Sequence, residues 1–214
     1  MVSPYDITSF VSTDGFEENA YILSEAEGGE CLVIDPGASA DRVIAHVVAG
    51  KLKVTRILAT HAHIDHVACA GLLSRHFGVP FLLNSYDSPM LSTLKEQALE
   101  FGYRELPDVT ADGLFAEGTR FQVGSVSLVV LGTPGHTPGS SCFLVGERDL
   151  FTGDTLFAGS IGRTDFPGGS PSQMEDSLKR LASLPGETSI YPGHGGTSTI
   201  GNERAHNPFL LSLL

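Results

Sequence analysis

The sequence predicts an α/β protein with two strand-rich halves, each of which also contains helices. Short apolar runs with alternating or β-branched residues recur along the chain, and helix-like stretches follow several of them. Histidines or aspartates flanked by glycine stand at the ends of several runs. The chain has 214 residues, 41% hydrophobic content and no low-complexity linker, so we expect a single domain over residues 1–214.

The first half is expected to alternate strands with helices. Three strands are expected before a turn at Asp35-Pro36-Gly37, at residues 6–11, 19–24 and 30–34. The patterns that follow predict helices over 41–49, 68–77 and 88–101, with strands at 54–59 and 80–83. Gly78 is expected to stop the second of these helices.

A second set of short strands is expected to begin after Pro107. The alternating, β-branched run 125–131 and the short apolar runs 149–152 and 188–191 each lead into a tight turn. A helix is expected over 171–182, between the last two of these strands.

Three histidines and an aspartate follow the expected strand at 54–59 within six residues: His61, His63, Asp65 and His66. Side chains alternate along an extended chain, so His61 and His63 would point to the same side and could bind one ion. A helix that begins at about Asp65 would turn Asp65 and His66 elsewhere, where they could hold a second ion. The motif predicts a binuclear metal site rather than ordinary surface or core histidines.

Three later segments each present a further candidate ligand at the end of an apolar run or between glycines. They carry His136 in 133–139, Asp154 in 150–155 and His194 in 191–196. Glycine beside these residues allows positive φ and a close approach of the backbone to a metal or substrate. One Gly-His or Gly-Asp pair alone would indicate a simple turn, but several such pairs in one chain favour a metal site.

Together these residues resemble the metal ligands of metallo-β-lactamase-fold hydrolases. The match to the seven ligands of that superfamily holds in identity and order: His61, His63, Asp65, His66, His136, Asp154 and His194. The resemblance covers nearly the whole chain and implies an αβ/βα four-layer sandwich, with the metal site at one edge between two sheets. It implies one ion on His61, His63 and His136, and another on Asp65, His66 and His194. Asp154 would bridge the two.

Within the superfamily, the chain is similar to short, single-domain bacterial glyoxalase II (hydroxyacylglutathione hydrolase). Asp154 lies in a Gly-Asp-Thr-Leu-Phe segment like that of these enzymes, whereas true β-lactamases usually have cysteine or serine there. The segments 162–166, 192–203 and 207–209 are also similar. Longer glyoxalase II enzymes add a C-terminal helical region whose basic residues bind the glutathione carboxylates, and this sequence ends at Leu214 without it. Recognition of glutathione therefore stays open.

The resemblance implies a metal-dependent hydrolase that cleaves a thioester of the S-lactoylglutathione type. Two cations that share a water lower its pKa from near 16 toward about 7, so a bridging hydroxide is the expected nucleophile. The ions would stabilise the oxyanion, and a thiolate leaves without a dedicated general acid. The candidate catalytic residues are Asp65, which could also orient the attacking oxygen, and Asp154.

Phe157 and Arg163, which both follow Asp154 in the sequence, are candidate substrate contacts. Arg163 lies nine residues after Asp154, where longer glyoxalase II enzymes carry a basic substrate-contacting residue. It could bind a carboxylate or a backbone carbonyl of the thiol, or instead pair with Asp165 as a structural link. Phe157 could line the pocket or belong to the core.

The cofactor and the reaction both have alternatives. Two divalent ions are expected; zinc suits imidazole and aspartate ligands, and the same set accepts iron or manganese. The main competing enzyme is a mononuclear iron persulfide dioxygenase, which shares the Gly-Arg-Thr-Asp-Phe of 162–166, although Pro-Gly-His-Gly at 192–195 favours hydrolysis. A lactonase or esterase of the same fold, or a metal-bound module without turnover, are further alternatives.

Composition restricts the partners. The formal net charge of −12 argues against a nucleic-acid partner, because phosphate binding needs a basic stripe. No run approaches a membrane span and no leader-like segment precedes the first strand, so a cytoplasmic protein with a small thioester substrate is expected. The sequence makes no prediction about oligomeric state. The widely spaced Cys31, Cys69 and Cys142 are expected to be free thiols.

Overall fold

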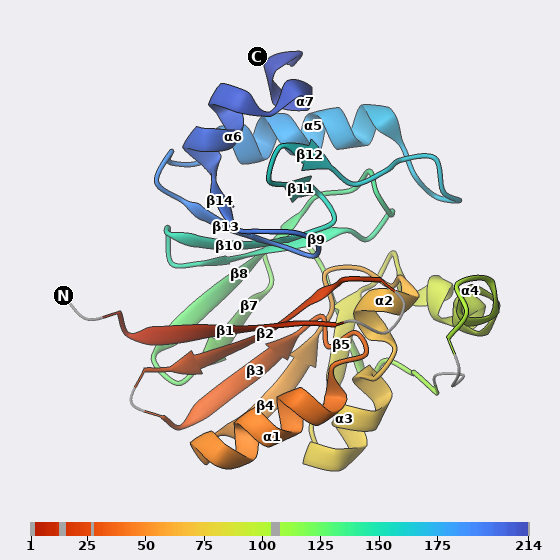
Figure 1. Cartoon of the computed structure of the whole chain (residues 1–214), viewed down its shortest axis with the longest axis vertical. Coiled ribbons are helices and arrows are strands. Elements are labelled where there is room, and N and C mark those ends of the chain that lie inside the picture. Colours follow the sequence, from red (N-terminus) through yellow and green to blue (C-terminus); the bar gives the residue numbers. More distant parts are fainter. Residues whose placement is uncertain (1–2, 13–15, 27, 104–107, 214) are drawn as a thin grey trace.

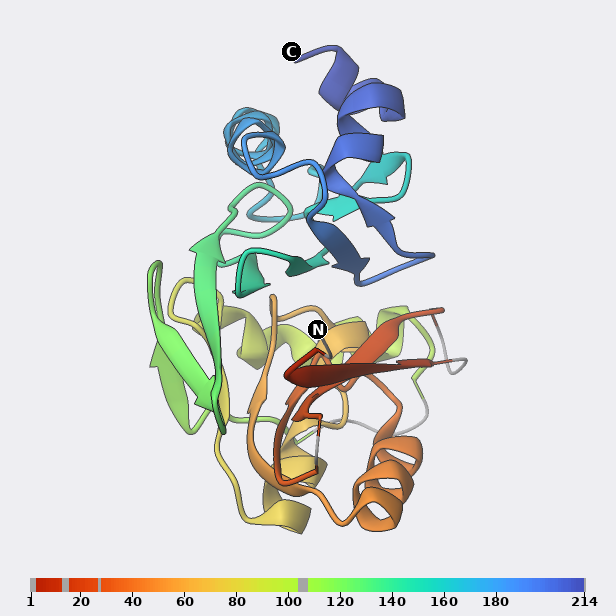
Figure 2. The same cartoon turned by 90° about the vertical axis from the view of Figure 1, so that its left-hand side faces the viewer.

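Two six-stranded sheets face each other, and helices cover the outer face of each (Figures 1 and 2). The computed structural model describes residues 3–12, 16–26, 28–103 and 108–213. The order of layers is helices, sheet, sheet, helices, which confirms the predicted αβ/βα four-layer sandwich.

The first sheet contains the strands of the N-terminal half in sequence order. Its strands are β1 (Tyr5–Val11), β2 (Asn19–Glu25), β3 (Glu30–Ile34), β4 (Lys53–Leu58), β5 (Phe81–Asn84) and β6 (Gly113–Phe115). The strands from β1 to β3 pair antiparallel, and those from β3 to β6 pair parallel. The helical elements of this half are α1 (Ala40–Gly50), α2 (Ile64–Val67), α3 (Ala70–Phe77), the 3-10 helix η1 (Ser88–Thr93) and α4 (Leu94–Glu100).

The second sheet has the strand order β14-β13-β10-β9-β8-β7. Its strands are β7 (Arg120–Val123), β8 (Val126–Gly132), β9 (Ser141–Val145), β10 (Asp149–Gly153), β13 (Ser189–Pro192) and β14 (Ser198–Thr199). A small hairpin is formed by β11 (Leu156–Phe157) and β12 (Ser160–Ile161). The helices are α5 (Pro171–Ala182), α6 (Ile200–His206) and α7 (Pro208–Leu211).

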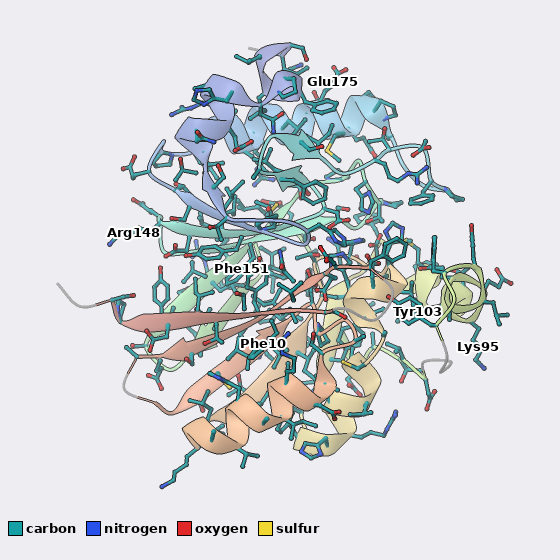
Figure 3. The ribbon with its side chains drawn as sticks, in the orientation of Figure 1. Phe10, Lys95, Tyr103, Arg148, Phe151 and Glu175 are labelled. Atoms are coloured by element: carbon teal, nitrogen blue, oxygen red, sulfur yellow. The ribbon has the colours of Figure 1, made fainter. Side chains whose placement is uncertain are left out.

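Three hydrophobic clusters hold the four layers together. In β2, Ile22 points toward α1 and α3, whereas Tyr21 and Leu23 point toward the second sheet, because side chains alternate along a strand. Figure 3 shows Phe10, from the cluster beneath the first sheet, and Phe151, from the cluster between the sheets. The third cluster packs α5, α6 and α7 onto the second sheet.

The structure corrects two expectations about these elements. The first part of the expected helix 88–101 is the 3-10 helix η1, in which Ser92 and Thr93 donate side-chain hydrogen bonds to carbonyls three residues back. The strands after Pro107 do not all form a second set, because β6 pairs parallel with β5 in the first sheet. Pro107 itself lies outside the described residues.

The other elements whose bounds were expected agree within about two residues, as is usual at element ends. The helix expected over 171–182 is α5, and Gly78 ends α3 in the left-handed conformation. Cys31, Cys69 and Cys142 are free and buried. In the described part of the chain, no helix is long and apolar enough to cross a membrane.

Candidate metal centre

Strands from both sheets end at the same edge of the sandwich. In the first sheet β4 ends at Leu58, just before the motif that begins at His61. In the second sheet β8, β10 and β13 run in the same direction, and His136, Asp154 and His194 come shortly after their ends. The predicted ligand residues therefore meet between the two sheets, as ligand sites commonly do at the carboxyl ends of strands.

A first group of ring nitrogens is formed by His61, His63 and His136. His63 Nδ1 lies 3.1 Å from His61 Nε2 and 2.9 Å from His136 Nε2. Two ligands at the zinc–nitrogen distance of about 2.0–2.1 Å in a tetrahedron would be about 3.3 Å apart. The spacing of these nitrogens fits one ion.

A second group is formed by Asp65, His66 and His194. Asp65 Oδ2 lies 3.3 Å from His194 Nε2 and 3.8 Å from His66 Nε2. His66 is fully buried, whereas His194 and Asp65 remain partly open to solvent. This group of one carboxylate and two imidazoles also has the spacing of a metal site.

Asp154 lies between the two groups and contacts both. Its Oδ2 is 3.6 Å from His136 Nε2 and 3.5 Å from His194 Nε2, and its Oδ1 is 3.3 Å from His66 Nε2. Asp154 Oδ1 and His66 Nε2 are buried without a hydrogen-bond partner. Unpartnered buried polar atoms that face one another across a small gap are what a cation site presents.

Three histidine rings are oriented by hydrogen bonds on their far side. The Nδ1 of His136 lies 2.7 Å from the carbonyl of Arg163, and the Nδ1 of His194 lies 2.6 Å from the carbonyl of Glu17. A carbonyl can only accept, so both Nδ1 atoms carry hydrogen, and the Nε2 atoms that face the site are the ones that would bind a metal once they are deprotonated. His61 Nδ1 likewise contacts Thr60 Oγ1 at 3.1 Å.

Electrostatics favours neutral rings at His61 and His63 and negative carboxylates at Asp65 and Asp154. Burial lowers the pKa of His61 well below its ordinary value and lowers the pKa of His63 to about 4, helped by neighbouring rings. Burial would raise the pKa of Asp65 and Asp154, but the adjacent His66 and the hydrogen bonds from His194 outweigh it and lower both.

In the second group the neighbouring carboxylates raise the pKa of the histidine rings. Burial disfavours charge on His66 and His194, but Asp154 and Asp65 outweigh it and raise both pKa values, that of His194 to about 10. In the absence of metal these rings therefore hold protons. A cation that binds here displaces them, as metal ligands must be deprotonated.

Two glycines allow the loops to close around these side chains. A Cβ at Gly193 would lie 2.3 Å from Asp154 Oδ1 and 2.6 Å from His66 Cε1. At Gly162, a Cβ would lie 1.8 Å from the carbonyl oxygen of Asp154. Any side chain at either position would displace candidate ligands, which agrees with the sequence-based expectation that glycine permits a close approach.

The predicted substrate contacts lie beside the centre. The Phe157 ring is 5.9 Å from the His194 ring, and the Phe166 ring is 5.7 Å from the His63 ring. The Arg163 guanidinium lies over the Phe166 ring at 3.9 Å and donates two hydrogen bonds, of 2.6 and 2.7 Å, to Asp165. Of the two roles expected for Arg163, the pairing with Asp165 is the one present in this structure.

Sequence reasoning missed a carboxylate behind His66. Asp35 was expected only as part of a turn, yet its Oδ2 lies 3.1 Å from His66 Nδ1. It also accepts hydrogen bonds from the Thr60 amide and from Thr60 Oγ1, each 2.7 Å long. Its signal was an acidic residue at the end of a buried strand, the same position that the candidate ligands occupy.

Comparison with known proteins assigns the family. The Metallo-beta-lactamase superfamily matches residues 13–194. The chain belongs to this superfamily. Members of the metallo-β-lactamase superfamily typically bind two metal ions, and the two groups joined by Asp154 provide the histidine and aspartate residues for such a pair.

Several members of the superfamily are similar over most of their length. Hydroxyacylglutathione hydrolase GloC of Haemophilus influenzae is 37% identical over 206 residues, which are 94% of this chain and 97% of that protein. A structure of the BLEG-1 B3 metallo-β-lactamase has a TM-score of 0.87 and 32% identity, covering 96% of this chain and 99% of that one. TTHA1623 in a di-iron-bound form has a TM-score of 0.85 and 37% identity, covering 95% and 100%. ETHE1 from Myxococcus xanthus has a TM-score of 0.80 and 29% identity, covering 95% and 83%.

Proposed function

We propose that this metallo-hydrolase cleaves thioesters of the S-lactoylglutathione type with two divalent ions held between its sheets. The observation that carries the proposal is the position of Asp154, which lies within 3.3–3.6 Å of ring nitrogens from both ligand groups and joins them into one centre. The similarity to hydroxyacylglutathione hydrolase GloC supports the choice of substrate. Zinc is the proposed metal; the di-iron form of TTHA1623 keeps iron as an alternative.

His61, His63 and His136 would hold one ion, and Asp65, His66 and His194 the other, with Asp154 shared. When bound, two such ions supply Lewis-acid chemistry, because they lower the pKa of water and polarise a thioester carbonyl.

The chain's own residues supply binding and orientation. Asp65 Oδ2 sits at the open side of the centre beside His194 and can accept a hydrogen bond from the attacking water. The Phe157 ring packs against His194 and the Phe166 ring against His63, so both would offer apolar surface to an acyl group bound at the centre. Arg163 is available to a substrate carboxylate when it leaves Asp165. Ligands from both sheets support the further proposal that residues 1–214 act as one domain.

The first experiment combines elemental analysis with three assays on the same preparation: hydrolysis of S-lactoylglutathione, oxygen uptake with glutathione persulfide, and cleavage of a β-lactam. About two metal ions per chain together with hydrolysis of S-lactoylglutathione would support the proposal. The Asp154→Asn variant is the matched control, since it removes the shared negative charge and one acceptor oxygen while keeping the shape of the side chain. Hydrolysis that persists unchanged in this variant would not come from the proposed centre.

The second candidate is a persulfide dioxygenase with a single iron. The segment Gly162-Arg163-Thr164-Asp165-Phe166 supports it, and similarity to the ETHE1 structure agrees with it. One iron per chain, with oxygen uptake in the presence of glutathione persulfide and no thioester cleavage, would replace hydrolysis by this reaction. The third assay uses a β-lactam, because of the similarity to BLEG-1, and cleavage of the β-lactam alone would overturn both proposals.

A further inference from the structure

The loop segment that carries His61 and His63 is held by side chains from three other parts of the chain. Alternate amides of this segment donate to them: Thr60 N to Asp35 Oδ1 at 2.7 Å, Ala62 N to Asp87 Oδ2 at 3.1 Å, and Ile64 N to Gln97 Oε1 at 2.9 Å. These three side chains therefore satisfy alternate backbone donors of the segment and hold it in place.

Asp87 differs from the other two because it also holds a loop of the second half. Its Oδ2 accepts a hydrogen bond of 2.8 Å from Thr137 Oγ1, and its Oδ1 accepts one of 2.6 Å from the amide of Gly139. Thr137 directly follows His136, and Ala62 lies between His61 and His63. One carboxylate thus joins the two backbone segments that supply all three residues of the first ligand group.

The surroundings of Asp87 leave little freedom for these loops to move. Asp87 is fully buried, and within the described part of the chain its side chain accepts no hydrogen bond from a candidate ligand side chain. A Cβ at Gly139 would lie 2.6 Å from the carboxyl group, so the loop approaches it as closely as glycine allows. Ser140 Oγ holds Thr137 Oγ1 from the other side at 2.7 Å.

We propose that Asp87 is a positioning residue that sets the spacing of His61 and His63 against His136, and so controls the affinity for the first metal ion. The inference rests on the proposed metal centre. Outer partners of metal ligands commonly change metal affinity by about 10–100-fold when they are mutated. The second group should be affected much less, because its residues are supported by Asp35 and by the carbonyl of Glu17.

The test is a titration of metal-free protein with Co²⁺, whose visible absorption reports coordination, followed by competition with Zn²⁺. Asp87→Asn keeps the size of the side chain but leaves one oxygen to accept where two accepted before. We expect two equivalents to bind in the wild type, and one of them to bind about 10–100-fold more weakly in the variant. The spectrum of the weaker equivalent should also change, which a merely lower stability would not cause.

A second variant distinguishes an effect of ligand position from an effect of the Asp87 charge. It also provides a test if Asp87→Asn does not fold. Thr137→Val removes one hydrogen bond to Asp87 and leaves the carboxylate charge in place. We expect it to weaken the same equivalent. Asp112→Asn is the matched control, because Asp112 also accepts a backbone amide hydrogen bond, from Phe81 at the opposite end of β5. This variant should bind both equivalents of metal as the wild type does.

Two results would overturn the inference, and a third would overturn the proposed function on which it rests. Unchanged affinity for both equivalents in folded Asp87→Asn would remove any role for Asp87 in the centre. Weakening in Asp87→Asn without any in Thr137→Val would assign the effect to charge. A wild-type protein that binds no metal would instead overturn the proposed function, so the two failures can be told apart.

Discussion

His66 Nε2 lies 3.3 Å from Asp154 Oδ1, and both atoms are buried without a hydrogen-bond partner. An unsatisfied buried polar group costs about 1–3 kcal/mol of folding free energy. A cation bound between these atoms would satisfy both of them. The stability of the fold is therefore expected to depend on metal.

Removal of metal should lower the melting temperature by roughly 10 °C. A metal at a thousand times its Kd stabilises the folded state by about 4 kcal/mol, and for a chain of this size 1 kcal/mol corresponds to about 2–4 °C. The measurement is thermal unfolding by circular dichroism before and after chelation. Zn²⁺ should restore the transition, whereas Ca²⁺, which prefers oxygen ligands, should not. Equal melting temperatures with and without metal would contradict a structural contribution of the ions.

Asp35→Asn should lower the affinity of the second group for its ion by about 10–100-fold, because the Asp35 carboxylate lies against the far side of the His66 ring. Asp35 has a φ of 46°, in a region that asparagine tolerates, so the backbone should keep its shape. Asparagine has one acceptor oxygen and no charge, and thus cannot replace both oxygens toward Thr60 and His66. The same Co²⁺ titration measures the effect.

The control for this variant is Asp108→Asn, which removes an exposed carboxylate that pairs with Arg75. It should bind both equivalents normally. The pattern for Asp35→Asn should also differ from that for Asp87→Asn, since Asp35 lies against His66 of the second group and Asp87 contacts no residue of that group. The same spectral change in both variants would mean that the two groups do not bind separate ions.

Substitution of Arg163 or of its partner should change KM more than kcat. Asp165→Asn removes the charge that holds the Arg163 guanidinium, so KM for a thioester with free carboxylates should fall. Arg163→Gln should raise that KM about tenfold, the value of one hydrogen bond to a charged group. Steady-state kinetics with a neutral thioester is the control and should show no change. If neither variant alters KM for the anionic substrate, the structural link to Asp165 is the whole role of Arg163.

The candidate ligands could be predicted from sequence because each one stands at a local signal. His61, His63, Asp65 and His66 occur within six residues after an apolar run, and the other three lie beside glycines at strand ends. The alternation of buried and half-buried residues in β8 indicated a strand in the same way, since period two is a local property. Their metal-binding role stays a prediction until ions are measured.

The supporting contacts could not be predicted, because they join residues far apart in sequence. Asp87 meets Gly139, and Gln97 meets Ile64, only after both halves have folded. The pairing of β6 with the first sheet depends on the same long-range packing, because a three-residue strand carries little pattern of its own. At Arg163 the sequence left two roles open, and the choice depends on a side-chain conformation.

At the edge of the sandwich opposite the metal centre, Tyr5 of β1 donates a hydrogen bond to Asp149 of β10 and joins the two sheets. Figure 3 shows Arg148, the neighbour of Asp149, on the side away from α4. Tyr5→Phe keeps the ring and removes the hydroxyl, so the free energy of unfolding in urea should fall by about 1–2 kcal/mol while metal affinity stays unchanged. Tyr86→Phe, at a ring that is 71% exposed, should change neither. A loss of metal affinity in Tyr5→Phe would show instead that the two edges are coupled through the packing between the sheets.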